Sequence, residues 1–143
     1  MANLNKSLIF AGSFSMLAAL LHITIIIGGA DWYRFFGAGE ELALLSEQGS
    51  LLPAAITMAI TTIFLIWAIY AFSGAGLVRD LPWVKPALVV ITLIYLVRGL
   101  GILPLLFFSP DLVDTFLVVT SIISSVIGIV HLMGYRQMIQ APQ

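Results

Sequence analysis

Four long apolar stretches constrain this 143-residue chain more than any other feature of its sequence. They cover approximately residues 8–28, 51–72, 86–108 and 113–133. A helix rises 1.5 Å per residue, so about 20 apolar residues cross the roughly 30 Å hydrocarbon core of a bilayer. Inside lipid, a single crossing segment satisfies its own backbone polar groups only as a helix. The sequence therefore predicts an all-α integral membrane protein, a four-transmembrane-helix bundle that forms a single membrane domain.

The composition agrees with a membrane-embedded chain. Hydrophobic residues make up 61% of it and charged residues 9%, and the mean hydropathy is +1.11. Soluble domains average about 45–50% apolar and about 25% charged residues. The net charge of −1 offers no basic surface for nucleic acid. The chain has no cysteine, which excludes disulfides and thiolate metal ligands. We expect membrane lipids as partners and no nucleic acid.

Punctuating residues mark the ends of the spans. Ser7 and Ser50 are predicted as helix N-caps, because a serine hydroxyl accepts a hydrogen bond from a free N–H of the first turn. Pro86 suits a first turn, and Pro104 should kink the third span because it removes a donor within the helix. The first stretch is longer than the roughly 7–15 apolar residues of a signal peptide, so it is expected to be a retained span.

Positive residues predict the orientation. Lys6, Arg79, Lys85 and Arg136 fall on one side of a four-span arrangement, and Arg34 alone falls on the other. Cytoplasmic loops of membrane proteins are enriched in lysine and arginine. We therefore expect a multi-pass protein of the cell's inner membrane, with both the N- and the C-terminus in the cytoplasm.

The outer loop, residues 29–50, is the one sizeable segment expected outside the spans. Trp32 and Tyr33 are predicted to mark the outer membrane interface, and the composition from Glu40 to Gln48 favours a short helix. We expect this helix to pack on the outer rim of the bundle. The loop is open to two interpretations, an interfacial aromatic anchor or a lid over a cavity.

Arg98 is the most informative residue within the spans. It lies about 18 Å along the third helix from the inner face, beyond the bilayer centre. An arginine at the centre of a membrane helix costs at least about 2.5–3.5 kcal/mol on insertion scales. Arg98 should therefore face the bundle interior or a wet cavity, and it should have a polar partner.

Other polar residues are expected at a similar depth, one or two from each of the other three spans and Tyr95 from the span of Arg98 itself. Together with Arg98 they form a candidate ligand-binding pocket, to which the outer loop adds a carboxylate. Its members are His22, Tyr95, Thr57, Thr61 and Ser121 from the spans and Glu40 from the loop. A structural interpretation remains open. Arg98 would then snorkel to the interface or pair with Glu40 or Glu41, and the histidine and threonines would bond their own helices.

No catalytic residue, metal site or cofactor is predicted. His22 and His131 differ in depth by roughly 18 Å, too far to share a haem iron. Two histidines at opposite faces also do not build a zinc site with three protein ligands. General acid–base chemistry needs an oriented pair, and no carboxylate lies within the first span near His22.

Three classes of function remain compatible with the sequence. The first is a small membrane protein that binds a lipid, a quinone or an anionic ligand near Arg98, or that acts as an accessory subunit of a larger membrane complex. The second is a small homo-oligomeric transporter or channel, since four helices seldom enclose a pathway alone. The third is a lipid-modifying membrane enzyme that uses His22. We rank them in this order.

Overall fold

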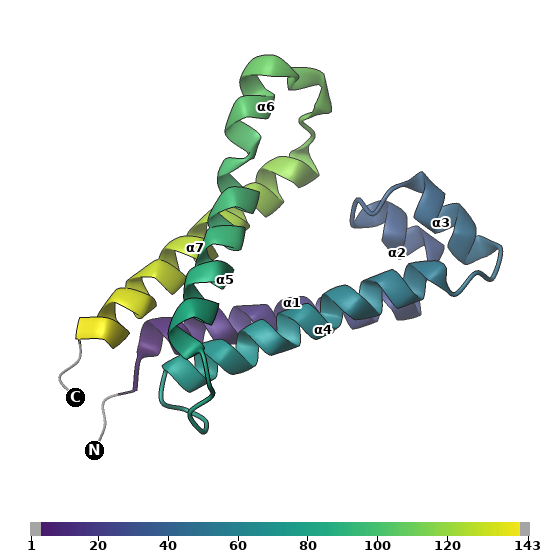
Figure 1. Cartoon of the computed structure of the whole chain (residues 1–143). Coiled ribbons are helices and arrows are strands. Elements are labelled where there is room, and N and C mark those ends of the chain that lie inside the picture. Colours follow the sequence, from purple (N-terminus) through teal and green to yellow (C-terminus); the bar gives the residue numbers. More distant parts are fainter. Residues whose placement is uncertain (1–3, 141–143) are drawn as a thin grey trace. The chain divides into compact units, whose positions relative to one another are not determined.

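The computed structural model describes residues 4–140, and every regular element in that range is helical (Figure 1). Seven α-helices and one short 3₁₀ helix follow one another along this part of the chain. They are α1 (Lys6–Gly28), α2 (Ala30–Phe35), α3 (Glu40–Glu47), α4 (Leu52–Gly74), α5 (Val84–Leu100), α6 (Ile102–Phe108), η1 (Pro110–Leu112) and α7 (Thr115–Gln140).

Four helical stretches are long and apolar enough to cross a membrane. They are α1, α4, the α5–α6 pair from Val84 to Phe108, and α7, with 23, 23, 25 and 26 residues. Their mean hydropathy lies between 2.0 and 2.2. The predicted fold class is therefore confirmed, and the chain is a four-span helical membrane protein with short helices between the spans. The last helix extends seven residues beyond the predicted end at residue 133.

The first helix is capped by a different residue from the one predicted. It begins at Lys6, so Ser7 lies inside its first turn. The Asn5 side chain caps it instead, with its Oδ1 accepting from the Leu8 N–H at 3.1 Å. The Asn5 amide also donates to the Gly134 carbonyl on α7 at 2.7 Å. Asn5 therefore caps one helix and ties it to another.

The third span is broken just beyond Arg98, as Pro104 predicts. Helix α5 ends at Leu100, Gly101 follows, and α6 begins at Ile102. Pro104 has no N–H to donate to the Leu100 carbonyl four residues earlier, so a continuous helix would lose a hydrogen bond there. The break separates a long α5 from a short and exposed α6, whose Phe107 and Phe108 side chains are more than 80% exposed.

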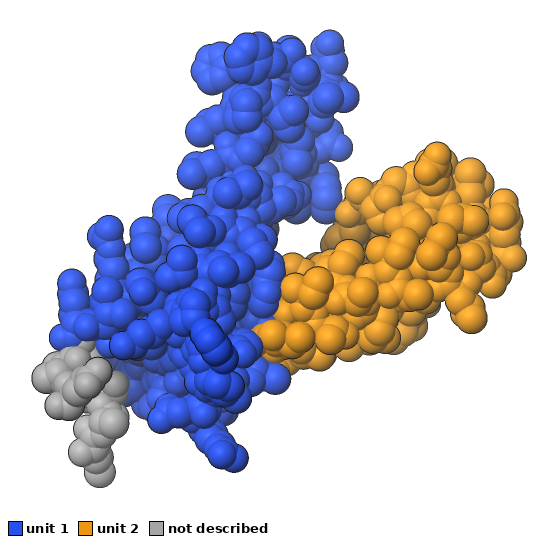
Figure 2. Space-filling view, viewed as in Figure 1, with its two compact units in different colours: residues 1–14, 67–143 blue, residues 15–66 orange. Residues whose placement is uncertain are grey.

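The chain forms two compact units (Figure 2), which are described separately below. Unit 1 comprises the described part of residues 1–14 and 67–143, and unit 2 comprises residues 15–66. Unit 1 therefore holds the beginning of α1, the end of α4, and α5, α6 and α7.

Unit 1 is organised around close helix approaches at glycines. Leu8 is fully buried and lies against Gly74 and Gly134, where an added Cβ would meet its side chain at 3.1 Å and 2.6 Å. Helices α5 and α7 pack along their length. Small residues let membrane helices approach closely, and tight packing contributes much of the stability of a membrane bundle.

Unit 2 holds α2 and α3 against the ends of α1 and α4. Tyr33 of α2 forms a small core with Ile25 of α1 and Ala43 of α3. Its hydroxyl lies 3.3 Å from that of Thr57 on α4. Only 2% of Tyr33 is exposed, so this residue packs inside unit 2. Its place at the membrane interface stays a prediction. The expected helix in this loop is confirmed as α3, and α2 is a second one.

Candidate functional site

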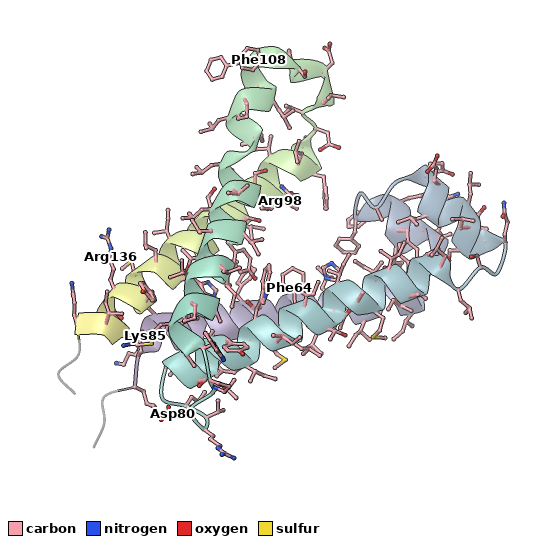
Figure 3. The ribbon with its side chains drawn as sticks, viewed as in Figure 1. Phe64, Asp80, Lys85, Arg98, Phe108 and Arg136 are labelled. Atoms are coloured by element: carbon pink, nitrogen blue, oxygen red, sulfur yellow. The ribbon has the colours of Figure 1, made fainter. Side chains whose placement is uncertain are left out.

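Arg98 reaches from α5 to two hydroxyl groups on α7. Its Nη1 donates to the Ser121 hydroxyl at 3.3 Å, and its Nη2 donates to the Thr120 hydroxyl at 3.2 Å. In Figure 3, Arg98 lies on α5 between Lys85 near the start of this helix and Phe108 at the end of α6. We call Arg98, Thr120 and Ser121 the Arg98 site. The structure thus brings together two predicted site residues, Arg98 and Ser121, and adds Thr120.

Glycine and serine set the spacing of this site. A Cβ added to Gly99 would lie 2.5 Å from the backbone nitrogen of Ser125, so α5 and α7 touch backbone to backbone there. A Cβ on Gly128 would lie 3.1 Å from the Leu96 nitrogen one turn further along the same seam. This close approach brings the serine and threonine of α7 within reach of the arginine, which is the residue next to Gly99.

The Thr120 hydroxyl is already oriented as an acceptor. Thr120 donates its own proton to the Phe116 carbonyl at 2.9 Å, which leaves its lone pairs for the guanidinium. Ser121 is buried, with 1% of the residue exposed. The two residues follow each other on α7 and present a short polar edge to α5.

The guanidinium has spare hydrogen-bonding capacity. An arginine side chain offers five N–H donors and no acceptor. Two hydroxyl oxygens accept from Arg98, and among the described residues of unit 1 no carboxylate lies within ion-pair distance of it. Arg98 is exposed on unit 1. The site is therefore an accessible cation with neutral partners.

Tyr95 belongs to an aromatic cluster in the core of unit 1. Its ring stacks on His131 with centroids 5.3 Å apart and meets Trp67 edge-on at 5.1 Å. His131 is fully buried, and its Nδ1 donates to the Ile127 carbonyl at 3.1 Å. Its Nε2 has no hydrogen-bond partner among the described residues. Tyr95 lies one turn from Arg98 on α5, as predicted, and it packs against α7 and α4.

The candidate residues of the first and second spans lie in unit 2 and bond their own helices. The His22 Nδ1 donates to the Ala18 carbonyl at 2.7 Å, and the His22 ring lies 5.2 Å from that of Phe64. Thr57 donates to the Pro53 carbonyl at 2.8 Å, and Thr61 donates to the Thr57 carbonyl at 2.9 Å. These contacts match the structural interpretation of the three residues.

The Glu40 carboxylate forms an ion pair with Arg34. It accepts two hydrogen bonds from Arg34, at 2.9 Å from Nε and 2.8 Å from Nη2. Arg34 also donates to Glu47 at 2.7 Å, and Asp31 lies 3.6 Å away. The hydrogen bonds from Arg34 hold the pKa of Glu40 below its usual range, and those to Glu40 and Glu47 raise the pKa of Arg34. This cluster joins α2 to α3.

Sequence reasoning missed two of these residues. Thr120 precedes the predicted Ser121 and reaches the same guanidinium, and a search for all hydroxyl residues within one turn of Ser121 would have found it. The sequence argument used Arg34 only as a positive charge on the outer side. Its spacing to Glu40 and Glu47 spans the turn at residues 37–39, and a helix–turn–helix reading of that segment would have brought the three together.

Comparison with protein-family models, curated proteins and solved structures gives no significant match to this chain. The geometry of the two units is therefore the basis for any functional argument. A single pocket that joins all seven predicted residues stays a prediction, because Arg98, Tyr95 and Ser121 belong to unit 1, and His22, Thr57, Thr61 and Glu40 belong to unit 2.

Proposed function

We propose that this membrane protein binds an amphiphile whose polar head accepts hydrogen bonds, a lipid, a quinone or another anionic ligand, at the Arg98 site. One observation carries the proposal. An exposed guanidinium within a membrane-spanning stretch has two neutral hydroxyl partners and no carboxylate among the described residues of unit 1. A cation in apolar surroundings is costly unless it is paired, and such residues mark binding sites in membrane proteins.

The surroundings of the site suit an apolar tail. Val119 and Ile122 are the chain neighbours of the hydroxyl pair on α7, and Ile94 lies one helical turn before Arg98 on α5. All three are roughly half exposed. An amphiphile would place its acceptor against the guanidinium and its chain along these side chains. The two hydroxyls would hold the guanidinium plane in a fixed orientation, which favours a two-point acceptor.

The test compares variants of Arg98 with a matched control. Arg98→Leu should lose its co-purifying amphiphile, as measured by native mass spectrometry after mild detergent extraction. Arg98→Lys should retain less than the wild type, because lysine cannot reproduce the fork of parallel donors. Arg79→Leu removes a cation outside the spans and should retain the wild-type complement.

Two results would count against binding. If Arg98→Leu unfolds while the folded Arg98→Lys variant retains the full complement, the arginine is a structural tie. If Arg98→Leu stays folded and retains every co-purifying molecule, the ligand site is absent. Docking of the protein onto a larger membrane complex would then be the better account.

The orientation is proposed from charge. The positions of Lys6, Arg79, Lys85 and Arg136 support a topology with both termini in the cytoplasm of a cell with an inner membrane. The native chain has no cysteine, so single cysteines can be introduced cleanly. A membrane-impermeant thiol reagent added from outside should modify Gln48→Cys and leave Gln140→Cys unmodified, and the opposite pattern would reverse the orientation.

A further inference from the structure

The level of the guanidinium along unit 1 narrows the class of ligand. Gly99 meets the Ser125 backbone, so the Arg98 Cα lies about level with Val126 on the antiparallel α7. The hydroxyls that Arg98 reaches are five and six residues nearer the start of α7. At 1.5 Å per residue the side chain therefore extends roughly 7–9 Å towards that end.

The Arg98 side chain extends towards the C-terminal end of α5, which is opposite to the direction in which helical side chains leave the backbone. In a helix the Cα–Cβ bond tilts towards the N-terminus, which for α5 is the opposite end of the span. The arginine thus turns back along its own helix, as long cationic side chains do when they snorkel towards a polar interface. Its guanidinium arrives at Thr120, five residues and hence about 7.5 Å from Thr115, where α7 begins.

The net charge of the ligand head distinguishes a quinone, a phosphate diester and a free phosphate as candidates for this site. Thr120 and Ser121 are neutral, so a neutral quinone would leave the cation uncompensated in an apolar setting. A phosphate diester carries one negative charge and two oxygens that match the guanidinium fork. Asp111 and Asp114 lie at the same end of the span. These two carboxylates disfavour a free, doubly charged phosphate relative to a singly charged diester.

We infer that the Arg98 site holds the phosphate of an anionic phospholipid drawn from the leaflet at the η1 end of unit 1. This inference rests on the proposed function and specifies its ligand. The phosphate accepts from Arg98, while the acyl chains lie along the exposed apolar side chains of α6 and α7. Local thinning of the bilayer brings the headgroup to the level of Thr120.

The experiment uses the whole protein in nanodiscs or mild detergent with four separate probes. These are phosphatidylglycerol, phosphatidylcholine, a ubiquinone and inorganic phosphate, each titrated against the protein and detected by native mass spectrometry. Phosphatidylglycerol should bind the wild type at least about tenfold more tightly than it binds Arg98→Leu, since charge-assisted hydrogen bonds are lost. Thr120→Val together with Ser121→Ala should weaken binding less, and Arg79→Leu should not change it.

The probes give distinguishable failures. If the ubiquinone binds in an Arg98-dependent way and phosphatidylglycerol does not, the phospholipid inference is overturned and the proposed function stands. Phosphatidylcholine is zwitterionic. If it binds as tightly as phosphatidylglycerol, the net negative charge of the lipid does not select the ligand, and the inference of an anionic phospholipid is overturned. Displacement of phosphatidylglycerol by millimolar inorganic phosphate would overturn the lipid as the source of the phosphate. If no probe depends on Arg98, both the inference and the proposed function fall.

Discussion

Arg34 of the α2–α3 hairpin in unit 2 and Arg98 of the α5–α7 seam in unit 1 have opposite surroundings. Arg34 lies outside the spans and has three carboxylates around it. Arg98 lies within a span and has two hydroxyls. Aqueous solvent lowers the cost of an isolated charge, whereas lipid raises it, yet the cation in the costlier setting has the weaker partners. Arg34 therefore joins α2 to α3 through ion pairs, whereas Arg98 has only neutral hydroxyl partners among the described residues of unit 1, which is what the proposed ligand binding requires.

The packing that holds the helices together around each arginine also differs. The hairpin is anchored by one large buried side chain, Tyr33, and the seam by the absence of side chains at Gly99 and Gly128. Four predictions test the roles of Tyr33, Gly99 and the ion pairs of Arg34, beginning with the largest expected effect.

Tyr33→Ala should detach the hairpin. It removes a side chain that is 2% exposed and contacts both α1 and α3, and aromatic-to-alanine changes in a core cost about 3–5 kcal/mol. Hydrogen exchange of α2 and α3 should accelerate strongly, while that of α5 and α7 should be unchanged. Tyr33→Phe retains the ring and loses only the contact with Thr57, so it should behave almost as the wild type. Equal exchange in the alanine variant and the wild type would contradict the anchoring role.

Gly99→Ala should destabilise the α5–α7 seam by about 1–3 kcal/mol, because its methyl group would collide with backbone atoms of Ser125 that cannot rotate away. The variant should unfold at a lower temperature in detergent and bind less amphiphile, since the arginine and the hydroxyls are moved apart. Val97→Ala on the exposed side of α5 is the control and should affect neither measurement. A wild-type melting temperature for Gly99→Ala would show that the α5–α7 contact at Gly99 has room for a methyl group.

Arg34→Met should loosen α2 from α3 without unfolding the spans. The substitution leaves Glu40 and Glu47 facing each other without a cation. Spin labels on cysteines at Phe35 and Leu44, which are both exposed, should report a broader distance distribution between the two helices. The same labels on Arg98→Met should report the wild-type distribution. A hairpin that is equally narrow in both variants would remove the distinction between the two arginines.

Acidification should reproduce part of the Arg34→Met effect. The folded pKa of Glu40 lies below its usual value, so the ion pair contributes stability that is fully present above the ordinary glutamate pKa of about 4.3. That contribution is lost as the pH falls below this value and through the folded pKa. The label distances should therefore broaden below about pH 4 in the wild type. Arg34→Met should lack this acid transition, and a transition in both proteins would point to other groups.

The sequence was sufficient for the spans and for the break in the third one. Length and apolarity determine a membrane helix locally, and Pro104 breaks the third span because it has no N–H to donate within the helix. The partners of Arg98 were harder to predict, because they depend on the register between α5 and α7. That register is set by the contact of Gly99 with Ser125, and these two residues are 26 positions apart.

The outer loop shows a second limit of local reasoning. An exposed interfacial aromatic and a buried one have the same sequence signature, so Tyr33 could not be distinguished from Trp32 by composition. The pairing of Arg34 with Glu40 required the turn at residues 37–39 to fold the two helices against each other. In both regions the sequence supplied the elements, and the contacts between elements decided which side chains meet.

The break at Gly101 has a consequence for how the protein fits membranes of different thickness. Helix α5 alone has 17 residues and a length of about 25 Å, whereas α5 and α6 together measure about 37 Å when aligned. An unbroken span meets a thinner bilayer by tilting as a whole. The third span can instead bend at Gly101 and shorten its hydrophobic length while α5 keeps its contact with α7. Hydrophobic mismatch is then absorbed by α6 alone, and the polar edge that receives Arg98 keeps its geometry.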